Sequence, residues 1–179
     1  MYCAISEARF GGIRNFHVEH FRPKGKFPML ENHIANLYLA CGICNVLKGD
    51  DWPCEPAADH SLATYADPAT TDYNTILSVS AATHEVIATT LSGRYIIERV
   101  LLNRAQLVLE RRLAAMLAGF EQFERWVEGA LDDMSEAELK AVSATLLKMS
   151  QTKTAMLKDR PYRDADTKRP VKAKAKKTR

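Results

Sequence analysis

Residues 1–56 hold short apolar stretches among many glycine, proline, histidine, cysteine and aromatic residues, with no sustained helical periodicity. Within this segment Cys41 and Cys44 form a C-x-x-C pair, Cys54 follows ten residues later, and Cys3 lies near the start. Such a composition is typical of small units in which a bound ligand replaces part of the apolar core. We therefore expect residues 1–56 to form a compact, ligand-stapled unit.

The cellular compartment decides how the four cysteines are used. The longest apolar stretches, residues 96–102 and 113–117, are far shorter than the roughly 20 residues that cross a bilayer, and the N-terminus lacks an apolar signal core. We therefore expect a cytoplasmic protein without a membrane partner. Because cytosolic thiols stay reduced, the cysteines are expected to be metal ligands or buried apolar side chains and not disulfides.

The formal net charge of +3 over 179 residues conceals an asymmetry. Residues 168–179 contain seven lysines and arginines and no acid, so the remainder of the chain carries a charge of −4. A basic run of this kind is most often a solvated arm. We expect residues 161–179 to be a disordered tail that adds salt-dependent affinity for nucleic acid without defining a site.

The rest of the chain predicts an α+β protein. β-Branched residues on either side of a polar patch predict a β-hairpin between residues 75 and 91, within a loop-rich region 57–93. After Gly93, apolar residues in 3-4 spacing predict a long helix from about residue 94 to 129. Ser135 and Glu138 match a capping box at the start of a second helix. We expect residues 94–160 to form a helical hairpin that packs on the core or on a partner.

The residues suited to chemistry lie in two strings, F-H-V-E-H-F-R-P-K at 16–24 and N-L-Y-L-A-C-G-I-C-N-V-L-K-G-D at 36–50. Hydrolysis of a phosphodiester needs an activated water and a cation that stabilises charge on the phosphate and the leaving oxygen. A histidine such as His20 can activate water near neutral pH. Glu19 and Asn45 offer the oxygen ligands that Mg²⁺ prefers.

Together, the two strings resemble the HNH endonucleases, which have a ββα-metal core. The resemblance covers residues 2–53 and is strongest to a bacterial subgroup with E-H-F-R-P-K followed by N-L-x-L-A-C-x-x-C-N-x-x-K-G. It implies that His20 is the general base, that Asn36 orients His20, and that Glu19 and Asn45 hold a catalytic Mg²⁺, Mn²⁺ or Ni²⁺. Some members act in anti-phage defence beside an ATPase, and the resemblance implies such a context here.

The resemblance also implies a structural zinc ion with four cysteine ligands. Cys3, Cys41 and Cys44 supply three of them, and Tyr2-Cys3 matches the end of a C-x-Y-C knuckle. We expect the natural chain to begin upstream, with a fourth cysteine immediately before Met1. Alternatively, Cys54 completes the site, or zinc is absent and Cys3 and Cys54 are small buried side chains.

Three cations close to these strings, Arg22, Lys24 and Lys48, are predicted to contact phosphates of a nucleic acid. For Arg22 and Lys24 the alternative is that they are ordinary loop charges. His17 lies two residues before Glu19, so on a strand both side chains would share one face. It either lines the site or is a partly exposed packing histidine.

The sequence thus predicts a metal-dependent endonuclease that acts on nucleic acid, with DNA favoured over RNA. One alternative is a zinc-stapled nucleic-acid-binding module without catalysis. Another is an effector that is active only with an ATPase or sensor partner, docked through the helical hairpin. In that second case the exposed apolar faces of the helices would also allow self-association.

Overall fold

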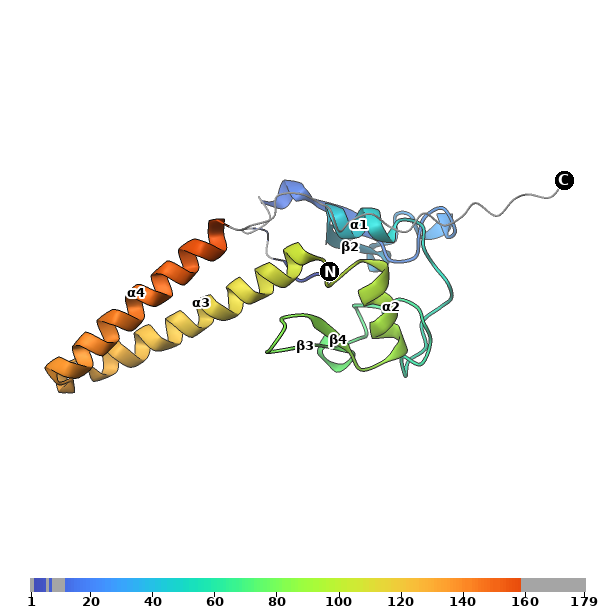
Figure 1. Ribbon diagram of the computed structural model, residues 1–179. Coiled ribbons are helices and arrows are strands. Elements are labelled where there is room, and N and C mark those ends of the chain that lie inside the picture. Colours follow the sequence, from blue (N-terminus) through green and yellow to red (C-terminus); the bar gives the residue numbers. More distant parts are fainter. Residues whose placement is uncertain (1, 6, 8–11, 159–179) are drawn as a thin grey trace. The chain divides into compact units, whose positions relative to one another are not determined.

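The computed structural model describes residues 2–5, 7 and 12–158 (Figure 1). Within this part the chain is α+β, as predicted, with four α-helices and two two-stranded antiparallel sheets. The described residues form two compact units, one made of residues 2–81 and 85–104, the other of residues 82–84 and 105–158. The predicted basic tail lies outside the described residues.

Two strands and a short helix form the N-terminal part of the first unit. Strand β1 (Phe16–His20) pairs antiparallel with β2 (Leu37–Cys41), so that Phe16 lies opposite Cys41 and His20 opposite Leu37. Helix α1 (Gly42–Lys48) follows β2 directly and packs against both strands (Figure 1). The end of β1 therefore lies close to helix α1 and to the connection between the two strands.

An aromatic core supports this arrangement from within the same unit. The Trp52 ring stacks on Tyr65 with centroids 6.4 Å apart, and Phe21 meets Trp52 edge-on at 5.0 Å. Beside them the Asp51 carboxylate accepts hydrogen bonds from Tyr65, Tyr95 and Arg99. Burial alone would raise the pKa of Asp51, but these hydrogen bonds outweigh it and leave the pKa below its ordinary value.

The predicted hairpin is present as strands β3 (Leu77–Val79) and β4 (Val86–Ala88). Helix α2 (Leu91–Arg99) begins earlier than predicted, because Thr90 caps it by accepting a hydrogen bond from Gly93 N. Gly93 therefore lies inside the helix and does not precede it. A Cβ at this position would lie 2.4 Å from Ile76 O, so glycine permits the close approach of α2 to the residue before β3.

The prediction of one continuous helix from residue 94 to 129 is wrong. Helix α2 ends at Arg99, and helix α3 (Ala105–Ala130) begins five residues after Val100. Leu101 takes a left-handed backbone conformation with φ of 49°. The Asn103 side chain binds both backbone polar groups of Val86, at 2.7 and 2.9 Å. This contact with β4 holds the chain in a turn that a continuous helix could not provide.

The second unit contains the predicted helical hairpin. Helix α3 contacts α4 (Glu136–Lys158), and a short 3-10 turn (Leu131–Asp133) joins them (Figure 1). The predicted capping box is confirmed: Ser135 Oγ accepts from Glu138 N at 3.4 Å, and Ser135 N donates to Glu138 Oε2 at 2.8 Å. Among the described residues, no helix combines the length and the apolar character that a bilayer crossing requires.

Candidate functional site

A pocket of about 280 Å³ opens beside β1 and α1 in the first unit. It brings together three of the four residues predicted to be catalytic, which come from the end of β1 and from the middle of α1. Residues from the connection after β1 and from the segment after α1 complete its wall. The lining includes Glu19, His20, Lys24, Asn45, Gly49 and Asp50.

The His20 ring is held by the backbone of the connection between the two strands. His20 Nε2 lies 2.9 Å from Glu31 O. A carbonyl oxygen only accepts hydrogen bonds, so this contact assigns the proton of a neutral imidazole to Nε2. Nδ1 is then the ring nitrogen that can accept a proton.

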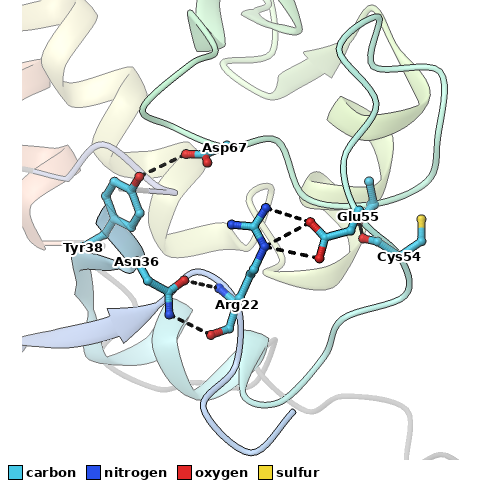
Figure 2. Close-up of polar contacts among 7 residues, drawn as sticks. Arg22, Asn36, Tyr38, Cys54, Glu55 and Asp67 are labelled. Atoms are coloured by element: carbon cyan, nitrogen blue, oxygen red, sulfur yellow. Dashed lines mark hydrogen bonds and ion pairs between the residues drawn. The ribbon is translucent and has the colours of Figure 1, made fainter. Parts of the chain in front are cut away.

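Asn36 holds the same connection, as Figure 2 shows for its contacts with Arg22. The side chain is only 2% exposed. Its Oδ1 accepts from Arg22 N at 2.7 Å, and its Nδ2 donates to Arg22 O at 3.0 Å and to Leu30 O at 3.2 Å. Leu30 precedes the residue whose carbonyl binds His20. Any orienting effect of Asn36 on His20 therefore acts through this loop.

Glu19 and Lys48 form a buried ion pair. The side chains are 3% and 0% exposed, and Lys48 Nζ lies 2.6 Å from Glu19 Oε1. Burial is the main reason why the pKa of Glu19 is raised, and the Lys48 ammonium partly offsets it. The prediction that Lys48 contacts phosphates needs correction, because its charge faces the protein interior.

Asn45 presents its amide from the middle of α1. Its Nδ2 lies 3.4 Å from His17 Nδ1, which leaves Oδ1 as the atom able to bind a cation. His17 is exposed and does not belong to the pocket wall described above. Its ring packs against the start of α1, where a Cβ on Gly42 would approach His17 Cε1 to 3.1 Å.

Asp50 is a pocket residue to which the sequence analysis gave no role. It follows Lys48 and Gly49 directly, and its carboxylate raises the pKa of Glu19 through charge repulsion, after the larger effects of burial and Lys48. Asp50 is the last residue of the second sequence string, which ends in K-G-D, so the sequence already placed this carboxylate beside the other candidates. A carboxylate two residues beyond a helix that carries Asn45 can return to the same pocket.

The pocket wall holds oxygen donors of the kind that a hard divalent cation prefers. Glu19, Asn45 and Asp50 supply two carboxylates and one amide oxygen. The contact from Lys48 to Glu19 Oε1 is an ion pair without the angles of a directed hydrogen bond, and Oε1 accepts none from the described residues. The buried carboxylate therefore retains lone pairs for a further ligand.

The two remaining predicted phosphate contacts already have acidic partners. Arg22 forms an ion pair with Glu55 at 2.7 Å (Figure 2), and Lys24 pairs with Glu31 at 3.0 Å. Lys24 is 58% exposed and lines the pocket, whereas Arg22 lies over the Trp52 ring at 5.7 Å. A phosphate would have to displace a carboxylate from either cation. Their role in binding nucleic acid remains a prediction.

Three of the four cysteines lie together at the other end of α1. The sulfur atoms of Cys3, Cys41 and Cys44 are all within 4.8 Å of one another. Three thiol donors at this spacing fit a zinc ion. Cys54 is exposed and does not belong to the cluster, so the structure does not support it as the fourth ligand. Its exposure also makes the expectation of a buried Cys54 wrong.

Arg104, which the sequence analysis did not single out, lies against these sulfur atoms. Its side chain is 5% exposed, with Nη1 and Nη2 each 3.7 Å from Cys44 Sγ and Nη2 3.9 Å from Cys41 Sγ. Hydrogen bonds from Cys3 and Cys44 lower the pKa of Cys41, and the Arg104 charge lowers it further. The guanidinium therefore favours the thiolate form of Cys41.

We compared the chain with protein-family models, with curated proteins and with solved structures, and none of them matches it.

Proposed function

We propose that this protein is a metal-dependent endonuclease that hydrolyses phosphodiester bonds of nucleic acid, with His20 as the general base. The observation that carries the proposal is the single pocket that Glu19, His20 and Asn45 share. An imidazole whose Nδ1 can accept a proton thereby lies beside oxygen donors suited to a divalent cation. The resemblance of residues 2–53 to HNH endonucleases agrees with these roles.

In the proposed reaction, His20 Nδ1 takes a proton from water as the water oxygen forms a bond to phosphorus. The bond from phosphorus to the leaving ester oxygen then breaks, and that oxygen gains a proton from solvent. Glu31 O holds the ring through Nε2 while Nδ1 works. Glu19 and Asn45, with Asp50 beside them, would hold Mg²⁺, Mn²⁺ or Ni²⁺, and such an ion stabilises charge on the phosphate and leaving oxygens.

The proposed substrate is nucleic acid, with DNA favoured over RNA. Lys24 is the exposed cation of the pocket wall, so it can contact a phosphate next to the one that is cleaved. The sulfur cluster would hold a structural zinc ion and so keep α1 in place. An anti-phage context with an ATPase partner belongs to the same proposal.

One observation favours an effector that depends on a partner. In the helical hairpin of the second unit, Trp126 and Leu147 are 57% and 60% exposed. Large apolar side chains at the surface of a hairpin are suited to a partner protein or a second copy. Such a partner would control the nuclease site without replacing its chemistry.

The proposal is tested by plasmid nicking with Mg²⁺, Mn²⁺ or Ni²⁺, with an EDTA control. His20→Ala should lower the cleavage rate by about 10²- to 10⁴-fold, because the base that activates water is lost. DNA binding, measured by fluorescence anisotropy, should stay nearly unchanged. His33→Ala, which alters an exposed histidine outside the pocket wall, is the matched control and should cleave normally. Equal cleavage by His20→Ala and wild-type protein would contradict the proposal.

A further inference from the structure

Lys48 is the last residue of α1 and is wholly buried. A lysine at the end of a short helix ordinarily extends its ammonium into water, where it is well hydrated. Here Nζ donates to His20 O at 2.9 Å and approaches Gly49 O at 3.5 Å. The Tyr65 ring lies 5.5 Å from Nζ on another side. The ammonium is therefore fixed in place by the backbone on either side of the pocket.

The fixed ammonium faces one catalytic side chain. Nζ lies 2.6 Å from Glu19 Oε1, and Glu19 is the residue next to His20 on β1. The charge thus holds the carboxylate in one position at the pocket wall. A carboxylate has two oxygens with several lone pairs, so one contact with Lys48 leaves room for a cation.

Stability alone does not account for this pair. Two charges lose most of their hydration on burial, and an apolar pair of similar volume is often as stable or more so. Three residues before Lys48, the same helix carries Asn45, and residues three apart lie on one helix face. Helix α1 therefore places Asn45, a proposed cation ligand, beside Lys48. Lys48 in turn pairs with Glu19, the second proposed ligand.

We propose that Lys48 is a positioning residue of the catalytic site, which acts by holding the Glu19 carboxylate in the orientation that binds the divalent cation. This inference rests on the proposed function, because it takes Glu19 as the ligand of that cation. Lys48 touches neither the cation nor the nucleic acid. Its contribution passes entirely through Glu19.

The test is Mn²⁺ binding in the absence of nucleic acid, measured from free Mn²⁺ by electron paramagnetic resonance. Lys48→Met keeps the length of the side chain and removes its charge. Loss of a residue that supports a metal ligand typically weakens metal affinity by about 10- to 100-fold, and we expect a loss of this size. Lys140→Met, which alters a lysine of α4 that is 76% exposed and lies outside the pocket wall, is the matched control and should bind Mn²⁺ as the wild type does.

A double-mutant cycle with Glu19→Gln isolates the route of the effect. When Glu19 is already replaced, adding Lys48→Met should change Mn²⁺ affinity by less than about twofold, because the two residues then have no ion pair to lose. An equal loss in both backgrounds would overturn the proposal, and so would wild-type affinity of Lys48→Met. If Lys48→Met alone does not fold, Glu19→Gln is compared with the double variant, in which neither charge is left unpaired. A difference in Mn²⁺ affinity below about twofold then supports the proposal, and a loss of about 10- to 100-fold overturns it.

Failure of this inference and failure of the nuclease proposal are distinguishable. Wild-type protein that binds Mn²⁺ but does not cleave would contradict the nuclease proposal and leave the Lys48 test intact. Wild-type protein that binds no Mn²⁺ would overturn the role given to Lys48.

Discussion

The two ends of helix α1 carry donor sets of opposite chemistry. At the N-terminal end, Cys41 and Cys44 place soft sulfur atoms next to Cys3. Asn45, in the middle of the helix, lines the pocket with Glu19, and Lys48 at the C-terminal end pairs with Glu19 in the interior. Each end also has a buried cation, which is Arg104 at the sulfur atoms and Lys48 at the carboxylate. One seven-residue helix therefore brings a sulfur cluster that could hold a metal ion close to the oxygen donors of the proposed catalytic site.

The difference between the two ends is their access to solvent. Cys41 and Cys44 are buried, whereas of the oxygen donors only Glu19 is buried, and Asn45 and Asp50 reach solvent at the pocket. Closed metal sites with sulfur ligands contribute to folding, and sites with an open position can bind substrate. Substitutions at the sulfur end should therefore change the fold and its stability, whereas substitutions at the oxygen end should change metal binding and cleavage.

The largest expected effect belongs to Cys44→Ser. A structural zinc site contributes about 10–16 kcal/mol of apparent binding free energy, which is folding free energy when the unfolded chain has no site. The variant should lose zinc and the folded state of the first unit. Zinc content by mass spectrometry of metals and thermal unfolding by circular dichroism measure both effects. Cys54→Ser should behave as the wild type, since Cys54 is exposed and lies outside the cluster.

A Cys44→Ser protein that contains no zinc yet unfolds at the wild-type temperature would break the comparison. The sulfur end would then be an ordinary part of the apolar core.

An intermediate effect is expected for Arg104→Met. Removal of one partner from a buried charged contact typically costs about 3–5 kcal/mol, because the other partner remains buried without compensation. The variant should release zinc faster under a chelator challenge and unfold at lower temperature, and Arg104→Lys should restore part of the loss. Arg94→Met, at an exposed position of α2, is the control. Zinc release at the wild-type rate would show that the guanidinium is not part of the sulfur site.

Much of the fold was predictable because its signals are local. The β-branched residues of β3 and β4 and the capping box at Ser135 each depend on neighbours a few positions away. The break between α2 and α3 was not predictable from periodicity. It depends on Asn103, whose partner Val86 lies 17 residues earlier. The apolar pattern of the sequence continues through this break, so the pattern alone does not reveal it.

The residues of the candidate site also fall into two groups, those that the sequence predicted and those that it could not predict. The motif strings predicted Glu19, His20 and Asn45, and the structure brings these three to one pocket. The buried positions of Lys48 and Arg104 could not be predicted, because a charged residue in a sequence is normally expected at the surface. Arg104 reaches a cysteine 60 residues earlier, and only the folded chain brings that partner to it.

The smallest expected effect on stability is that of Asn36→Ala, which sharpens the comparison at the oxygen end. The change removes three hydrogen bonds to the backbone of Arg22 and Leu30, and loss of such buried contacts costs about 1–3 kcal/mol. Cleavage should fall further than this modest loss of stability would suggest, because the loop that carries Glu31 O also holds the His20 ring. The measurement is single-turnover cleavage at saturating Mn²⁺, together with urea unfolding.

Asn32→Ala is the matched control for that experiment, since Asn32 is an exposed asparagine of the same connection. If Asn36→Ala cleaved as fast as Asn32→Ala, the orientation of His20 would not depend on the loop. If instead Asn36→Ala lost Mn²⁺ affinity as well as rate, the loop would also support the cation ligands. A lower cleavage rate at unchanged Mn²⁺ affinity would show that the two proposed positioning contacts act separately. The loop backbone would then hold His20, and Lys48 would hold the Glu19 carboxylate.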